Sequence, residues 1–300
     1  MSESYMERAI ELARAVEGRT SPNPPVGAVL VQDGEVVGEG NTQPPGGPHA
    51  EIVALEAAGE RARNSTLYVT LEPCSHWGRT PPCADALVRA GVSSVHAALL
   101  DPNPLVRGQG VQRLRADGVE VIIGENSAEA SELIAAHARY SVSGKPLVTL
   151  FLSGPATVLS RFIGTADALL SDAGSPEPSL LQAIRIAGRT PQRRVVKVGR
   201  ESAVVSEMRP NPVRTSPDRR STLPATVWDW TELLVELARR ETTSVLIPGP
   251  GEVAQAMMKY GLVDRIVSSK RSHVPREFGA PRPGAMGESY FVANREDDAP

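Results

Sequence analysis

Short apolar runs alternate with segments of helical periodicity along the first half of the chain. The runs contain the β-branched residues typical of buried strands, whereas the segments between them repeat apolar residues every three or four positions. The expected strands are residues 26–31, 36–37, 67–71, 95–100 and 119–123, and the expected helices are residues 5–16, 49–63, 84–90, 111–115 and 128–140. Strands that alternate with helices predict a three-layer α/β domain.

The second half gives the same signals less regularly, and it follows the turn at residues 143–146. Its expected strands are residues 147–152, 194–198, 244–247, 264–267 and 289–292, and its expected helices are residues 231–240 and 252–260. Residues 207–224 are rich in proline, arginine and serine, and we expect them to form a loop. The pattern therefore predicts two α/β domains, residues 1–145 and residues 146–300.

Composition narrows the class of protein. The chain has 300 residues, of which 41% are hydrophobic and 22% charged, as in a soluble protein of two domains. No apolar run is long enough to span a membrane, and the polar, acidic N-terminus is unlike a signal peptide. A net charge of −3 and 4% aromatic residues give no general attraction for nucleic acid. Because 2 cysteines cannot form a disulfide framework, we expect a reducing compartment, the cytoplasm.

The two cysteines and a three-residue segment that begins with a histidine say most about the function of this chain. The triplet His49-Ala50-Glu51 precedes Cys74 and Cys83 in the chain. Zinc deaminases hold the ion with one histidine and two cysteines, and a glutamate that is not a ligand carries protons. We therefore predict that His49, Cys74 and Cys83 bind Zn²⁺ and that Glu51 is the acid/base. The alternatives are a structural zinc site and two buried cysteines without a ligand.

The neighbouring prolines explain how these residues could converge. Residues i and i+2 point away from each other in a regular helix, so His49 and Glu51 can share a pocket only at a helix start, where Pro48 places them. Pro82 likewise predicts a helix start at Cys83, whose thiolate the helix dipole would stabilise. Cys74 follows an expected strand. Two helix N-termini and one strand end would then face a single cation.

Four segments of the first half resemble one family closely. They are Ser21 to Val29, Pro48 to Glu51, Glu72 to Cys83 and Asp101 to Pro104, within a match that covers residues 5–145. They resemble the deaminase domain of the bifunctional riboflavin-biosynthesis deaminase/reductase family, which shares the eight-residue gap between the cysteines. The resemblance implies a cytidine-deaminase-like fold that hydrolytically deaminates 2,5-diamino-6-ribosylamino-4(3H)-pyrimidinone 5′-phosphate, a small phosphoribosyl-pyrimidine, at the 2-amino carbon.

The same resemblance implies a set of substrate contacts. These are Asn23, His76, Arg79, Asp101 and Asn103. From the residues alone, each has a plain alternative as a turn residue or a solvated loop charge. The family usually has a substrate-binding histidine where Asn41-Thr42 stands, and threonine cannot carry a charge. His96 and His137 are expected to be packing or surface residues.

The second half resembles the family's dihydrofolate-reductase-like domain in its opening strand, Lys145 to Leu150. The expected lysine and aspartate that should follow are absent from residues 151–157, and a glycine-rich phosphate loop reads Pro248-Gly249-Pro250-Gly251 instead. Proline there removes a backbone donor. The domain is also shorter than the family norm. We therefore expect a degenerate reductase-like domain that does not use NADPH, and hence a separate reductase.

The leading hypothesis is a zinc-dependent deaminase of riboflavin biosynthesis, expected to be a homodimer, that uses no nucleic acid or membrane partner. One alternative keeps the chemistry and changes the substrate to another aminopyrimidine or a purine in a specialised pathway. The other is a non-catalytic scaffold that binds a partner or a metabolite of the pathway.

Overall fold

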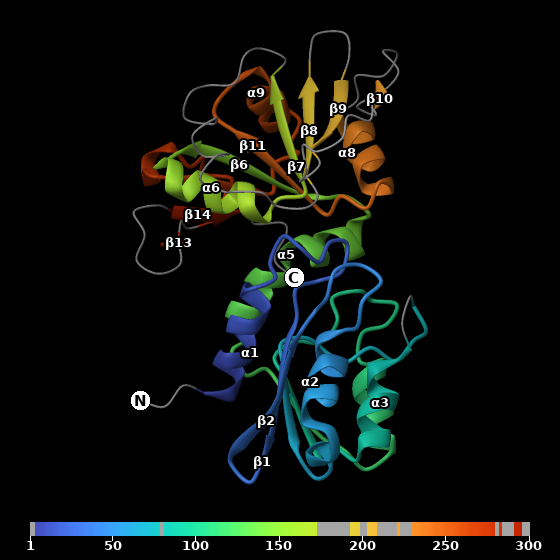
Figure 1. Cartoon of the computed structure of the whole chain (residues 1–300). Helices are drawn as coiled ribbons and strands as arrows, with labels where there is room; N and C mark the ends of the chain where they lie inside the picture. Colours follow the sequence, from blue (N-terminus) through green and yellow to red (C-terminus); the bar gives the residue numbers. More distant parts are fainter. Residues whose placement is uncertain are drawn as a thin grey trace, which may run out of the picture. The chain divides into compact units, whose positions relative to one another are not determined.

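The computed structural model describes residues 4–78, 81–172, 193–198, 203–208, 221–222, 230–279, 282–283 and 291–295. The chain divides into two compact units, Met1–Val142 and Ser143–Pro300 (Figure 1). Each unit is built around its own β-sheet, with order β2-β1-β3-β4-β5 in the first and β10-β9-β8-β7-β11-β6-β12-β14-β13 in the second. Among the described residues, no helix has both the length and the apolar character needed to cross a bilayer.

The first sheet is a hairpin joined to three mutually parallel strands. The strands are β1 (Gly27–Gln32), β2 (Glu35–Asn41), β3 (Thr66–Val69), β4 (Ser94–Ala97) and β5 (Glu120–Ile123). β1 pairs antiparallel with both β2 and β3, whereas β3, β4 and β5 run parallel. The hairpin turns at Asp33 and Gly34, both with positive φ, as the Asp-Gly pair predicts.

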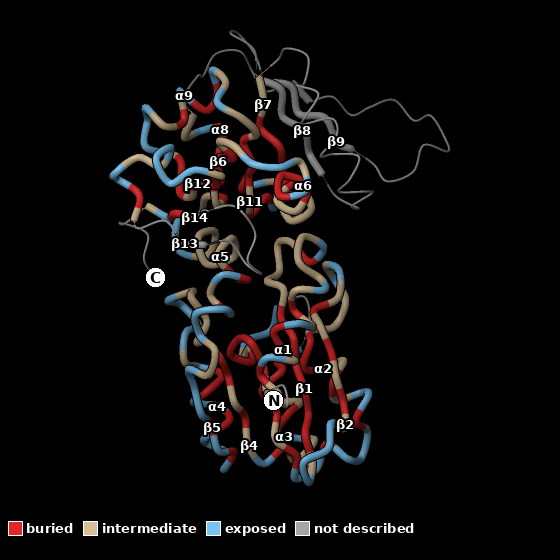
Figure 2. The backbone as a smooth tube through the Cα atoms, turned by 90° about the vertical axis from the view of Figure 1, so that its left-hand side faces the viewer, coloured by how far each residue is buried: buried red, intermediate tan, exposed pale blue. Residues whose placement is uncertain are grey.

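Helices cover both faces of this sheet. The helices are α1 (Tyr5–Arg14), α2 (Ala50–Ala58), α3 (Cys83–Ala90), α4 (Gln109–Ala116) and α5 (Ser127–Ser143), with a 3₁₀ turn at Gly59–Ala62. β1 shows how the layers form, because it is buried on both faces (Figure 2). Its Ala28 and Leu30 belong to a core cluster with residues of α2, α3 and α4, while Val29 and Val31 belong to another with residues of α1. The expected three-layer α/β fold of the first unit is therefore confirmed.

The second unit also has a central sheet with helices. Its strands are β6 (Leu147–Ser153), β7 (Ala168–Asp172), β8 (Arg193–Val198), β9 (Ala203–Met208), β10 (Ser221–Thr222), β11 (Ser244–Pro248), β12 (Arg265–Ser268), β13 (Arg282–Pro283) and β14 (Phe291–Asn294), and its helices are α6 (Ala156–Thr165), α8 (Trp230–Arg239) and α9 (Glu252–Lys259), with a 3₁₀ turn at Arg271–His273. β8, β7, β11, β6 and β12 run parallel in the middle of the sheet. The apolar faces of α8 and α9 pack in one core cluster and that of α6 in another.

Two parts of the second unit differ from the sequence-based expectation. Helix α6 and strands β7, β9 and β13 have no counterpart among the expected elements, although Val158, Leu159 and Ile163 of α6 are buried against the sheet. The predicted loop 207–224 is wrong at both ends, because residues 207–208 close β9 and residues 221–222 form β10. Residues 209–220 and 223–224 lie outside the described part of the chain.

Candidate metal centre and substrate pocket

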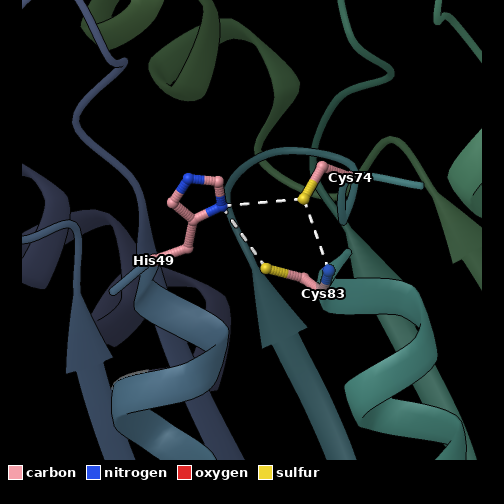
Figure 3. A group of neighbouring side chains, drawn as sticks. All are labelled: His49, Cys74 and Cys83. Carbon is pink, nitrogen blue, oxygen red and sulfur yellow. Dashed lines mark hydrogen bonds between the residues drawn. The ribbon is translucent and has the colours of Figure 1, made fainter. Parts of the chain in front are cut away.

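His49, Cys74 and Cys83 lie together in the first unit, although they are far apart in the sequence (Figure 3). The His49 Nδ1 atom is 3.6 Å from Cys74 Sγ and 3.4 Å from Cys83 Sγ. The Cys83 N–H donates to Cys74 Sγ at 3.3 Å. All three potential ligand atoms lie within 4.8 Å of one another. Among the residues that the structure describes, this is the one such group of histidine, cysteine or carboxylate side chains.

Element ends position each of these side chains. His49 is the N-cap of α2, with extended φ and ψ of −73° and 163°. Cys83 is the first residue of α3 after the N-cap Pro82, and Cys74 follows the end of β3. The start of α2 lies directly on β2, because a Cβ atom placed on Gly40 would lie only 2.2 Å from the Ala50 carbonyl oxygen. A glycine at position 40 thus lets the helix start approach the sheet.

The donor set fits zinc. Zinc takes cysteine sulfur at about 2.3 Å and histidine nitrogen at about 2.0–2.1 Å in tetrahedral geometry, which puts adjacent ligand atoms roughly 3.6 Å apart. The two nitrogen–sulfur distances of 3.6 and 3.4 Å are close to that spacing. Three protein ligands leave a fourth position for water or substrate, as catalytic zinc sites require.

The site has strongly perturbed acid–base properties. Burial, with a contribution from the nearby Cys74 charge, raises the pKa of Glu51 to about 7. Hydrogen bonding by the Cys83 thiol lowers the pKa of Cys74 to about 4, and the same contact raises the pKa of Cys83. The Cys74 thiolate in turn raises the pKa of His49. A cation bound between the two sulfurs would favour ionisation of both thiols.

A pocket of about 250 Å³ opens next to this group. Its walls include three of the five expected substrate contacts, Asn23, His76 and Asp101, together with Glu51. Asn103 is not among the lining residues. Arg79 lies outside the described residues, so its assignment stays a prediction. The pocket lies at the carboxyl ends of parallel strands, the usual place for ligands in an α/β sheet.

The two polar residues on the loop after β4 also form a turn. The Asp101 Oδ1 atom accepts the Asn103 N–H at 2.8 Å, and Asn103 Oδ1 accepts the Leu105 N–H at 3.0 Å. Asp101 is therefore a turn residue, as the alternative interpretation predicts. This role does not exclude a substrate contact, because Asp101 also lines the pocket.

Sequence reasoning missed two ionisable residues of the pocket wall. Glu72 and His137 both line it, the first at the end of β3 and the second on α5. His137 was expected to be a packing or surface residue, but helical spacing from the buried Ala130 and Ile134 could have placed it on the inner face of α5. Burial lowers the pKa of this histidine. Nothing in the local sequence around Glu72 identifies its partners.

Thr42 replaces the histidine that the family resemblance leads one to expect. It lines the pocket, yet its side chain is buried, with 3% exposed. The hydroxyl accepts the Val26 N–H at 3.0 Å and lies 3.5 Å from the Val26 carbonyl oxygen. Thr42 therefore uses its hydroxyl to join the start of β1 to the end of β2.

The fold and the donor set define a class, the zinc-binding deaminases. The family model of the cytidine and deoxycytidylate deaminase zinc-binding region matches residues 1–99. The chain belongs to the diaminohydroxyphosphoribosylaminopyrimidine deaminase family, as similarity to individual proteins shows. It is 52% identical over 128 residues to the diaminohydroxyphosphoribosylamino-pyrimidine deaminase of Buchnera aphidicola, a match that covers 43% of this chain and 87% of that protein.

Two further relatives show how far the similarity extends. The chain is 50% identical over 150 residues to the riboflavin biosynthesis protein RibD of Aquifex aeolicus, which covers 50% of this chain but only 42% of that protein. The matched region therefore spans about two fifths of that relative. A crystal structure from Thermotoga maritima, a diaminohydroxyphosphoribosylaminopyrimidine deaminase/5-amino-6-(5-phosphoribosylamino)uracil reductase, aligns with a TM-score of 0.75 and 27% identity over 96% of each chain. This whole-chain alignment confirms the expected α/β class of both units.

Proposed function

We propose that the first unit is a zinc-dependent hydrolase that deaminates a phosphoribosylated diaminopyrimidinone in riboflavin biosynthesis. The observation that carries this proposal is that a buried carboxylate, Glu51, lines the same pocket as two of the three converged zinc-type ligands, His49 and Cys74. The named activity of the Buchnera relative supports the choice of substrate. Asn23, His76, Arg79, Asp101 and Asn103 are the proposed substrate contacts.

The residues have distinct parts in this chemistry. His49, Cys74 and Cys83 would hold the ion, and zinc in such a site supplies a nucleophilic water by lowering its pKa. The Glu51 carboxylate takes a proton from the attacking water and gives protons to the ring nitrogen and the departing amine. The carbon–nitrogen bond breaks as the new carbon–oxygen bond becomes a carbonyl, so that water is consumed and ammonia is released. Glu51 is 4% exposed, and its shielding from bulk water keeps this proton within the pocket.

The wild-type protein is expected to release ammonia from the diaminopyrimidinone ribosyl phosphate. A coupled ammonia assay with zinc-loaded protein measures this directly, and Arg79→Ala should raise KM because it removes a candidate partner of the phosphate. Turnover of a different aminopyrimidine or purine, with none of the first substrate, would favour the changed-substrate alternative. Zinc-loaded protein that turns over neither would favour a scaffold.

We also propose that the second unit has lost the reductase activity. A glycine-rich loop before a helix normally leaves the helix N-terminus open to a cofactor phosphate. In this chain, the Asp172 carboxylate occupies the start of α9, where Oδ1 accepts the Val253 N–H at 2.9 Å. A Cβ atom placed on Gly251 would lie 1.9 Å from Asp172 Oδ2, so the loop is packed against this carboxylate. A phosphate there would meet a negative charge and one backbone donor already in use.

NADPH is accordingly expected to bind without saturation up to about 1 mM, which means a binding free energy weaker than about −4 kcal/mol. Titration monitored by NADPH fluorescence or calorimetry measures this, with a functional dihydrofolate reductase as the positive control. Saturable binding in the micromolar range would contradict the loss of the reductase.

Loss of the reductase activity requires a separate protein that reduces the ribosyl ring, and we propose that this protein and the deaminase both act in the cytoplasm. Gel filtration with light scattering will test the expected homodimer.

A further inference from the structure

The Glu72 carboxylate accepts three backbone hydrogen bonds, although the residue lies in a loop. It follows β3, and 5% of it is exposed. Its Oε2 atom accepts the Asp101 N–H at 3.0 Å and the Gly108 N–H at 2.9 Å, and its Oε1 atom accepts the Val111 N–H at 3.1 Å. One buried carboxylate therefore satisfies three backbone donors from a different part of the chain.

These contacts fix both ends of one loop. Residues 101–108 leave β4 and return to α4, and Glu72 binds the first and last residues of this segment. The outer part of the loop has little burial of its own, and its Leu105 is 80% exposed. Because apolar packing does not hold the loop, its conformation depends on the turn hydrogen bonds within it and on the bonds at its two ends.

The same residue lies close in the chain to Cys74, one of the proposed zinc ligands. Its own N–H donates to the Leu99 carbonyl oxygen at 2.8 Å, and it precedes Cys74 by two positions. The next residue contacts α4 directly, because a Cβ atom placed on Gly110 would lie 1.9 Å from the Pro73 carbonyl oxygen. Glu72 thus lies between the cysteine ligand and the loop that carries Asp101 into the pocket.

We propose that Glu72 is a positioning residue, which holds the 101–108 loop in its substrate-binding conformation and ties it to the strand end that carries Cys74. The inference rests on the proposed deaminase function and adds a residue that acts on the substrate through Asp101. A preformed loop saves the entropy that a mobile loop would lose on binding, so the effect falls on substrate affinity.

A carboxylate is required because all three partners are donors. Glutamine has one acceptor oxygen, and its amide nitrogen is a donor. If the amide oxygen faces Asp101 and Gly108, the amide nitrogen opposes the Val111 N–H. In the opposite orientation, two backbone donors lose their acceptor. Glu72→Gln therefore keeps the size of the side chain and disrupts the loop anchor.

Glu72→Gln is expected to raise KM about tenfold while kcat changes less than about threefold. Zinc content should stay at the wild-type value. Asp167→Asn is a matched control, since Asp167 is a buried carboxylate of the second unit that accepts the Thr243 N–H at 2.7 Å, the Thr243 hydroxyl at 2.8 Å and the Ser244 N–H at 3.2 Å. A single oxygen, Oδ2, accepts all three bonds, so asparagine can keep them with its amide oxygen, and Asp167→Asn should leave both KM and zinc content unchanged.

A double-mutant cycle separates a positioning role from general damage. If Glu72 acts through Asp101, Glu72→Gln should raise KM less than about threefold in an Asp101→Ala background. The same tenfold rise in both backgrounds, or a loss of kcat at unchanged KM, overturns the proposal.

Hydrogen exchange tests the anchor without any activity measurement. Within the segment of residues 101–111, the amides of Asp101, Gly108 and Val111 should exchange slowly in the wild-type protein and faster in Glu72→Gln, while peptides from β1 stay unchanged. Fast exchange of this segment in the wild-type protein would overturn the proposal even if the variant failed to fold. If the wild-type protein lacks deaminase activity, the proposed function fails, and the exchange result still decides whether Glu72 holds the loop.

Discussion

Glu51→Gln is expected to lower kcat for ammonia release by about 10²- to 10⁴-fold, the range for loss of a positioned acid/base. Glutamine is close to glutamate in size, so the buried side chain at the start of α2 can be replaced without a cavity. It cannot take a proton from water or deliver one to the amine. KM should change little, because the proton transfers occur in the transition state and not in substrate binding.

The matched control is Glu56→Gln on the same helix. Glu56 is an exposed residue of α2, so this variant makes the same chemical change on the outer side of the helix and should retain full activity. Zinc content, measured by atomic emission, should equal the wild-type value in both variants, because neither glutamate is a proposed ligand. Activity of Glu51→Gln within tenfold of the wild type would rule out Glu51 as the proton carrier.

Most helices and strands of the first unit could be predicted from the sequence, because their apolar residues recur with the period of a helix or of a strand. The expected strand 26–31 is observed as Gly27–Gln32, and the expected helix 84–90 as Cys83–Ala90, which ends at Gly91 with φ of 75°. Pro48 and Pro82 placed His49 and Cys83 at helix starts, as observed. Local residue chemistry and packing agree here, and such agreement makes sequence reasoning work.

Helix α6 is a segment in which local residue chemistry and tertiary packing disagree. Its residues include Thr157, Val158, Phe162 and Thr165, which have modest helix propensity, and Gly154-Pro155 immediately before it suggests a loop. The helix forms because Val158, Leu159 and Ile163 pack on the sheet in one buried cluster. Tertiary contacts therefore decide this segment, and a local pattern cannot show them.

The pocket likewise contains residues that the sequence predicts and residues that it does not. The predicted ligands His49, Cys74 and Cys83 do lie together, and the predicted acid/base Glu51 lines the same pocket as two of them, so this grouping could be expected from the residue types and their order in the sequence. Glu72 could not, because its partners Asp101 and Val111 lie 29 and 39 residues away and contribute only backbone N–H groups. Any residue except proline offers such a donor, so no side-chain pattern marks the contact.

Thr42 and His137 change the expected picture of the pocket wall. The Thr42 hydroxyl is held by the backbone of Val26, so this threonine acts in the β1–β2 pairing more than in recognition. His137 adds an imidazole from the opposite layer of the fold, with its Nε2 atom 3.3 Å from the Ser141 hydroxyl. The wall therefore has a different distribution of polar groups from the one that the sequence resemblance implied, and a substrate panel must include close analogues.

Cys83→Ser and His49→Gln are expected to reduce zinc content from about one ion per chain to a small fraction and to abolish ammonia release. Serine preserves the size of the buried Cys83 side chain, which is 1% exposed, but replaces a soft thiolate with a hydroxyl that stays protonated. The first unit should also unfold at a lower temperature, because bound metal stabilises the native state by mass action.

His96→Gln is the matched control for the histidine variant. His96 belongs to the same unit and is partly buried, but it pairs with Glu125 at 3.3 Å and stands outside the ligand group. This variant should keep its zinc and its activity.

Treatment of the wild-type protein with a chelator should abolish activity, and added zinc should restore it in the wild type but not in Cys83→Ser. Full zinc content in either ligand variant would show that the ion binds elsewhere and would contradict this ligand set.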